Sequence, residues 1–170
     1  EFEERVLKRL RKDYTIGSED IDDIEFVGKR IRWIKASGGA TAPHIQVDQQ
    51  LAVDDLHEIV FERSLKDDVL CTPFLHTEYR SVLGMINWLQ SRTQFQSCYK
   101  FSRAASRQAA PTIGDCRAVN KLVRAIKAAP VALHFWPLKG NLRLLGFPDA
   151  SYKNNEDKSS QRAPTIFLAE

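Results

Sequence analysis

Apolar residues follow two different periods along this chain, and each period occupies its own region. Between residues 77 and 126 apolar side chains recur every three or four positions, which is the spacing of one helix face. At 43–47 and 131–136 apolar and polar residues alternate, as they do in a half-buried β-strand. Helices and strands that occupy separate regions predict an α+β fold.

The N-terminal part is expected to hold a helix, a β-hairpin and a second helix. Apolar residues four apart predict an amphipathic helix over 2–14. Branched and aromatic residues predict a strand over 24–35, irregular at Gly28, which pairs with 43–47 in a β-hairpin over about 24–48. Asp48 can then cap a helix over roughly 49–63, with Leu56, Ile59 and Val60 facing inward.

The middle of the chain is expected to be helical. An extended connector over 64–76 leads to a helix capped by Thr77, and a further helix covers roughly 94–109. Thr112 and Asp115 have capping-box spacing, so a third helix should begin there and end before Pro130. The expected strands 131–136 and 142–148 follow, and a last apolar run covers 166–168.

Charge is distributed unevenly, although the formal net charge is only +3. Residues 1–70 carry 11 Lys and Arg against 16 Asp and Glu, whereas residues 71–170 carry 14 against 6. Such a local basic excess suits phosphate binding, because each neutralised phosphate releases condensed counterions. It suits an ordinary solvated helix surface equally well. On the first interpretation, two helical stripes would contact phosphates: Lys100, Arg103 and Arg107, then Arg117, Lys121 and Arg124.

Cysteine usage and hydropathy bear on the compartment. Three cysteines without CxxC spacing favour reduced thiols, and no apolar stretch approaches the roughly 18 residues of a membrane span. Nothing resembles a signal peptide. We therefore expect a cytoplasmic or nuclear protein that is not secreted and has no membrane partner.

Two acidic pairs invite a catalytic interpretation. Val53-Asp54-Asp55 imitates the paired carboxylates with which polymerases hold two metal ions. Its neighbours predict a helix, so we interpret the pair as a solvated helix N-terminus, where Asp is favourable to the dipole. Asp22-Asp23 lacks an upstream partner strand. Asp149 follows an apolar run, and a lone Asp at such a position is usually a turn former.

Taken in order, the segments resemble the C-terminal part of a copia-type LTR-retrotransposon polyprotein. Residues 79–89 resemble the family's YRSxxG helix, which follows a Thr-Pro connector like Thr72-Pro73. Residues 149–161, with Asp-Ala-Ser and Ser-Ser-Gln, are similar to the opening of its RNase H region. Weaker matches fall at 26–31, 45–49, 101–103 and 111–127. Residues 91–94 and Pro164 depart from the family pattern.

The resemblance implies a reverse transcriptase joined to an RNase H. It assigns 1–70 to the end of the palm with its β-hairpin, 71–140 to a thumb and connection region, and 141–170 to the truncated first hairpin of an RNase-H-like sheet. Asp149 would be a catalytic, Mg²⁺-binding carboxylate in the intact parent. The polymerase's paired Asp and the other RNase H carboxylates would be missing, so we expect no cofactor for this chain alone.

These observations support one leading hypothesis and two alternatives. The chain would be a fragment of a Pol polyprotein that binds an RNA–DNA hybrid or a DNA duplex through basic helices and is inactive on its own. Its further partners would be the missing flanking parts of that polyprotein. Alternatively, it is a non-enzymatic interaction scaffold whose open sheet edge at 142–168 pairs with another chain, or an inert pseudogene product.

Overall fold

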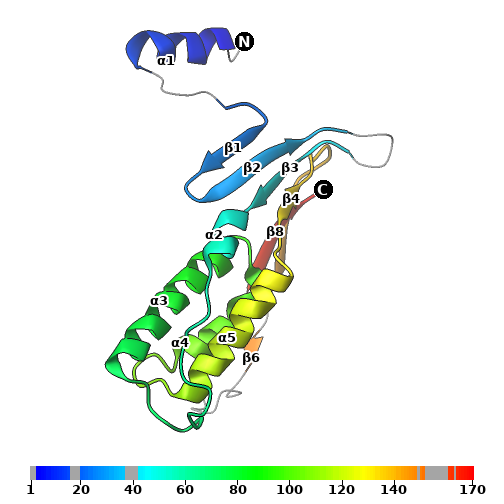
Figure 1. Cartoon of the computed structure of the whole chain (residues 1–170). Coiled ribbons are helices and arrows are strands. Elements are labelled where there is room, and N and C mark those ends of the chain that lie inside the picture. Colours follow the sequence, from blue (N-terminus) through cyan, green and yellow to red (C-terminus); the bar gives the residue numbers. More distant parts are fainter. Residues whose placement is uncertain (1–2, 16–19, 37–41, 149, 152–160, 163) are drawn as a thin grey trace. The chain divides into compact units, whose positions relative to one another are not determined.

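The computed structural model describes residues 3–15, 20–36, 42–148, 150–151, 161–162 and 164–170. It divides the chain into two compact units, Glu1–Phe135 and Trp136–Glu170. Helices and antiparallel sheets occur in separate stretches (Figure 1), so the predicted α+β class is confirmed. The predicted segment 1–70 belongs to the first unit, whereas the predicted segment 71–140 extends past the boundary at 135–136 into the second unit.

Within its described residues, the first unit contains a π-helical turn, five α-helices, a 3₁₀ turn and four strands. In chain order these are η1 (Glu3–Leu7), α1 (Lys8–Asp13), β1 (Asp23–Phe26), β2 (Lys29–Ile34), β3 (His44–Asp48), α2 (Gln50–Asp55), α3 (Pro73–Gln90), η2 (Phe95–Ser97), α4 (Cys98–Ala105), α5 (Ile113–Ala128) and β4 (Leu133–Phe135). The second unit contains β5 (Arg143–Phe147), β6 (Ala150–Ser151), β7 (Gln161–Arg162) and β8 (Thr165–Ala169).

The strands β1 to β4 form one antiparallel sheet in sequential order. The predicted pairing of β2 with β3 is confirmed, from Arg30 opposite Asp48 to Ile34 opposite His44. The predicted single strand over 24–35 is wrong, because Val27 and Gly28 form a two-residue turn between β1 and β2. Both have positive φ, 49° and 62°, as this hairpin geometry requires.

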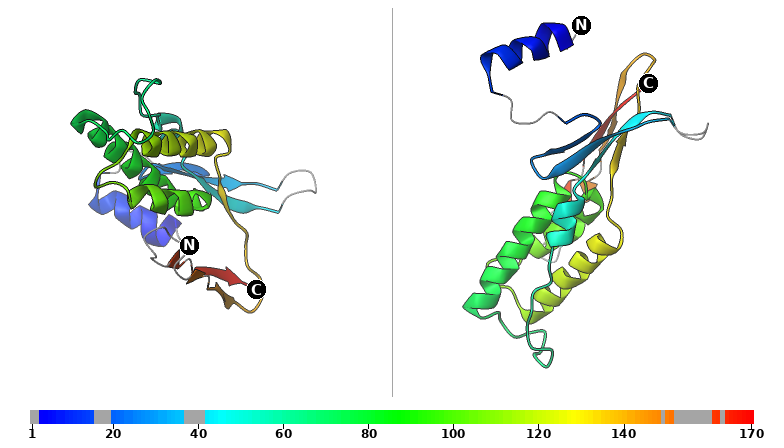
Figure 2. Two further views of the ribbon diagram at one scale, coloured as in Figure 1. Left: turned by 90° about the horizontal axis from the view of Figure 1, so that it is seen from below. Right: turned by 45° about the horizontal axis from the view of Figure 1, so that its top comes forward.

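The helices between β3 and β4 pack around one core. Strand β4 pairs with β3, so the chain leaves the sheet at β3 and returns to it beside the same strand (Figures 1 and 2). The apolar residues that recur every three or four positions in α3 and α5 are buried, which confirms the helical faces predicted from that spacing. These core residues are Tyr79, Val82, Leu83, Ile86 and Leu89 on α3, and Val119, Leu122, Val123 and Ile126 on α5.

The helices α3 and α5 each begin at a threonine whose side chain caps the helix. The capping box is confirmed, since the Thr112 hydroxyl accepts from the Asp115 N–H while the Asp115 carboxylate accepts from the Thr112 N–H. The predicted cap at Thr77 is wrong. Helix α3 begins five residues earlier than a cap at Thr77 would place it, because Thr72 is its N-cap and Pro73 occupies the first helical position. Helix α4 is shorter than the predicted helix over 94–109, because residues 95–97 form the 3₁₀ turn η2 and the helix ends at Ala105.

The predicted helix over 49–63 ends at Asp55, after which the chain is not helical. The N-cap of α2 is Gln49 and not Asp48 as predicted, although the Asp48 carboxylate accepts a hydrogen bond from the Gln50 N–H at 3.1 Å. Leu56 and Ile59 are buried as predicted, but Val60 is 84% exposed. The Asp pair at 54–55 therefore lies at the C-terminal end of α2, not at a helix N-terminus as the sequence suggested.

In the second unit, β5 and β8 form an antiparallel pair, with Arg143 opposite Ala169 and Phe147 opposite Thr165. The expected pairing of the two apolar runs is thereby confirmed. Pro164 precedes β8, so it removes no hydrogen-bond donor from this pair. Asp149, between β5 and β6, lies outside the described residues.

Candidate nucleic-acid interface

A basic hollow of about 530 Å³ lies between α5 and the non-helical segment 56–67, which is irregular up to residue 62 and then turns. We call it the basic hollow and define it by four cations and one carboxylate. The cations are Arg63, Arg117, Lys121 and Arg124, and the carboxylate is Glu58. Three of the six predicted phosphate-binding residues, those on α5, are thus brought together. Arg63 was not predicted.

The segment 56–67 is held against α5 by side chains that replace its missing helix hydrogen bonds. The Asn120 amide accepts from the Ile59 N–H at 2.8 Å and donates to the Ile59 carbonyl at 2.9 Å. The Lys127 ammonium donates to the carbonyls of Asp54, at 3.0 Å, and Leu56, at 2.7 Å. A cation at the end of α2 also suits the helix dipole. The α2 helix can therefore stop at Asp55 without leaving these carbonyls unpaired.

Arg117 fixes the far end of the same segment. Its guanidinium pairs with the Asp67 carboxylate and donates to the carbonyls of Arg63, at 3.1 Å, and Leu65, at 2.6 Å. At Gly114 a Cβ would lie only 3.1 Å from the Asp67 backbone, so glycine permits this close approach. Arg117 is therefore primarily a structural residue of the hollow's wall.

The four cations differ in what they already contact. Arg124 forms an ion pair with Glu58, as Arg117 does with Asp67. Among the described residues, Arg63 and Lys121 have no carboxylate partner, and both are exposed. An incoming anion would thus meet Arg63 and Lys121 first, because their charges are not neutralised.

The other predicted stripe is separate from the hollow. Lys100 and Arg103 lie on α4, and Arg107 lies in the turn that follows it. All lining residues of the basic hollow come from 58–63 and α5, so none of these three residues lines it. Lys100 is exposed, and its neighbour Tyr99 is exposed as well.

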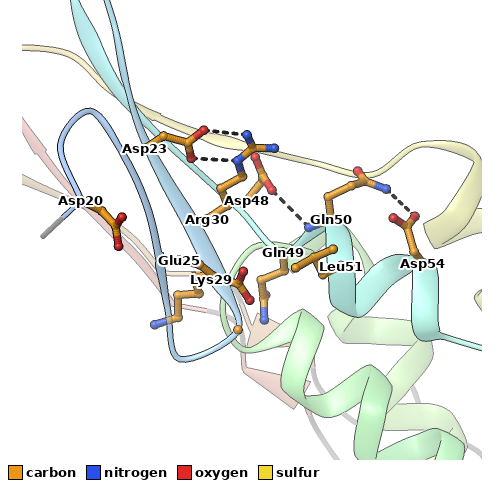
Figure 3. Close-up of a pocket in the computed structure, with 11 residues that line it drawn as sticks. Asp20, Asp23, Glu25, Lys29, Arg30, Asp48, Gln49, Gln50, Leu51 and Asp54 are labelled. Atoms are coloured by element: carbon orange, nitrogen blue, oxygen red, sulfur yellow. Dashed lines mark hydrogen bonds and ion pairs between the residues drawn. The ribbon is translucent and has the colours of Figure 1, made fainter. Parts of the chain in front are cut away.

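A second hollow of similar size lies between the β1–β2 hairpin and α2, and its charge has the opposite sign (Figure 3). Its lining has five carboxylates and two cations: Asp20, Asp23, Glu25, Asp48 and Asp54, with Lys29 and Arg30. The Arg30 guanidinium donates to both oxygens of Asp23, at 2.8 and 2.6 Å, and holds the pKa of that carboxyl below its usual value. A polyanion is repelled here, so the basic hollow is the better candidate interface.

The predicted metal ligand, Asp149, lies outside the described residues. Within the described part of the chain, no three His, Cys, Asp or Glu side chains are grouped to hold a metal ion. Nor does any helix described here combine the length and the apolar character needed to cross a membrane.

Comparisons with protein-family models, curated proteins and solved structures found no match to the chain.

Proposed function

We propose that this chain is the thumb and connection region of a copia-type reverse-transcriptase polyprotein, and that its basic hollow binds the phosphate backbone of an RNA–DNA hybrid or a DNA duplex. One observation carries the second part: four cations and one carboxylate surround a single hollow, and two of the cations have no acidic partner among the described residues. The family assignment rests on the ordered motifs of the sequence.

The four cations would have different roles in binding. Arg63 and Lys121 are available to contact phosphate oxygens directly, since no described carboxylate competes for them. Arg117 and Arg124 hold the walls through Asp67 and Glu58 and add to the local potential. Contacts of this kind fix the position of a duplex without reading its sequence.

On this proposal the chain is a binding module in the cytoplasm or nucleus. Polymerisation and RNA cleavage belong to the intact parent, where Asp149 would contribute to a Mg²⁺ site together with further carboxylates. Two-metal phosphodiester chemistry requires several carboxylates, so we expect neither activity from the chain alone.

A salt titration of duplex binding tests the proposal. Fluorescence anisotropy with a labelled RNA–DNA hybrid should give an affinity that falls steeply as salt rises. The substitutions Arg63→Glu and Lys121→Glu should each reduce the slope of log K against log salt by about one, because each removes about one phosphate contact. Arg80→Glu, at an exposed position of α3 outside the hollow, is the matched control.

Two outcomes would contradict the proposal. One is affinity that does not respond to salt, and the other is an equal loss of affinity in the Arg80 control and in the two hollow variants. Circular dichroism on each variant would show whether the fold has been kept.

A specific observation supports a second candidate, an interaction scaffold. Both faces of the β5–β8 pair are apolar and exposed, with Leu144 76% and Ile166 71% exposed on one face. Within the described residues each of these strands has only one strand partner, and an exposed apolar edge favours pairing with another chain. Self-association that resists salt and is abolished by Leu144→Asp would favour this candidate.

A further inference from the structure

Two thiols that are distant in sequence lie in contact inside the helical part. The sulfur atoms of Cys71 and Cys116 are 3.3 Å apart, although the residues are separated by 45 positions. Cys116 is fully buried in the core, whereas Cys71 is partly exposed. Of the two cysteines, Cys71 is therefore the one that a small solute would meet first.

Backbone hydrogen bonds hold both cysteines in place. The Cys71 N–H donates to the Pro111 carbonyl at 2.9 Å, and Ile113 N–H donates to the Val69 carbonyl at 2.9 Å. Cys116 lies in the first turn of α5, where its N–H donates to the Thr112 carbonyl at 3.1 Å. The two sulfur atoms therefore stay adjacent, and a small side-chain movement brings them to the roughly 2.05 Å of a disulfide bond.

We infer that Cys71 and Cys116 form a redox-active dithiol, a modification site that a small oxidised disulfide such as oxidised glutathione converts into an internal Cys71–Cys116 disulfide. This inference is independent of duplex binding. It requires only the juxtaposition of the two thiols and the partial exposure of one of them.

The exchange proceeds in two balanced steps. The Cys71 thiolate attacks one sulfur of the small disulfide, whose S–S bond breaks, and the departing thiolate takes up a proton. The Cys116 thiol then loses its proton and attacks the Cys71 sulfur, which releases the second small thiol. In total, two protein thiols are oxidised to one disulfide and one small disulfide is reduced to two thiols.

The order of attack follows from exposure and acidity. Burial, together with the neighbouring Cys71, raises the pKa of Cys116 to about 12, so Cys116 remains a thiol at neutral pH. Since the thiolate is the nucleophile, Cys116 is a slow first attacker and acts as the resolving cysteine. Cys71, the more exposed of the two, is the entry point.

The third cysteine provides the control. Cys98 is exposed at the start of α4, and its thiol donates to the Gln90 side-chain oxygen at 2.8 Å. Replacing it with Ser removes the one other thiol of the chain without touching the core. The Cys98→Ser protein is therefore the parent for the experiment.

The test is incubation of folded Cys98→Ser protein with oxidised glutathione, followed by alkylation and intact-mass analysis. The expected product has lost two hydrogens, carries no glutathione and is not alkylated, and its thermal unfolding midpoint is higher than that of the reduced protein. The midpoint rises because the bond closes the loop that contains α3 and α4. Adding Cys116→Ala should stop the reaction at a mixed disulfide on Cys71, and adding Cys71→Ser should leave Cys116 unmodified.

The inference is overturned if the Cys98→Ser protein accumulates as a stable mixed disulfide, forms only intermolecular dimers, or remains fully reduced. The decisive measurement uses a protein with an intact core, so a folding defect in the Cys116→Ala variant does not affect it.

Discussion

The side-chain amide of Asn120 on α5 pairs with both backbone polar groups of Ile59, which lies 61 positions earlier in the chain. Both residues are buried, so water is not an alternative partner for the Ile59 N–H and carbonyl. Together with Lys127 and Arg117, this contact explains why the chain after α2 can run against α5 without forming a helix.

Replacing Asn120 with Ala should therefore be strongly destabilising. Two buried backbone groups lose their partner, and we expect the free energy of unfolding in urea to fall by about 2–4 kcal/mol. Asn87→Ala, at an exposed position of α3, is the control and should change it by less than about 0.5 kcal/mol. Equal effects of the two substitutions would show that the Ile59 contact is unimportant.

Substitutions of Arg117 and Arg124 should lower the free energy of unfolding by different amounts, although each arginine pairs with a carboxylate. Arg117→Met loses the carbonyls of Arg63 and Leu65 as well as Asp67, and we expect a cost of about 1–2 kcal/mol. Arg124→Met loses only an exposed ion pair, which is worth up to about 1 kcal/mol. When urea unfolding is repeated at about 1 M salt, most of the loss of unfolding free energy caused by Arg117→Met should remain, because salt screens hydrogen bonds to carbonyls poorly. A cost that vanishes with salt would refute this role.

Because Tyr79 is buried, we expect the protein to lose stability at high pH. The buried Tyr79 hydroxyl donates to the Ala104 carbonyl at 2.7 Å, and burial raises the pKa of Tyr79 well above its ordinary value. The unfolded chain releases this proton at about pH 10. The stabilising contribution is thus complete below about pH 10 and is lost as pH rises above it toward the folded pKa.

The measurement for Tyr79 is the unfolding free energy of wild type and Tyr79→Phe between neutral and alkaline pH. The wild type should lose more stability than the variant above about pH 10. Parallel pH profiles would contradict a raised pKa for Tyr79.

The turn between β1 and β2 contains a residue whose backbone conformation is unfavourable for its side chain, and a substitution there should stabilise the protein. Val27 has φ of 49°, a region that β-branched residues rarely adopt, and its side chain is 58% exposed, so little packing is at stake. Val27→Asn should raise the free energy of unfolding by about 1 kcal/mol, since Asn-Gly is the preferred pair in this turn. Val27→Ala keeps the strained φ and should stabilise less; if it stabilises equally, turn geometry is not the cause.

The two basic stripes predict different effects on duplex binding. Lys121→Glu changes the basic hollow, whereas Lys100→Glu changes α4 outside it. We expect the first substitution to weaken hybrid binding more than the second at equal salt, because neighbouring cations reinforce each other at the hollow. A larger effect at Lys100 would move the interface to α4.

Sequence patterns were sufficient where the deciding contacts are local. The capping box at Thr112 and the buried faces of α3 and α5 depend on residues three or four apart, and all were predictable. The end of α2 could not be predicted in this way, because the carbonyls at that end accept hydrogen bonds from Lys127, some 70 positions away. One signal was present: Asn120 falls at a core-facing position of α5, where a polar residue needs a buried partner.

The candidate site shows the same limit. The stripe on α5 was predictable from helical spacing, but the pairing of Arg117 with Asp67 and of Arg124 with Glu58 depends on a segment 50 to 66 positions away. Arg63 gave no local signal, because it follows an irregular stretch that the sequence had assigned to a helix.

The hydrogen bonding of β4 to β3 gives the region between them the topology of an inserted domain. Both ends of this region meet at neighbouring positions of one sheet, so a short hairpin loop could replace it while leaving the strand order intact. For the same reason the excised region is suited to circularisation or to grafting into a β-hairpin of an unrelated host.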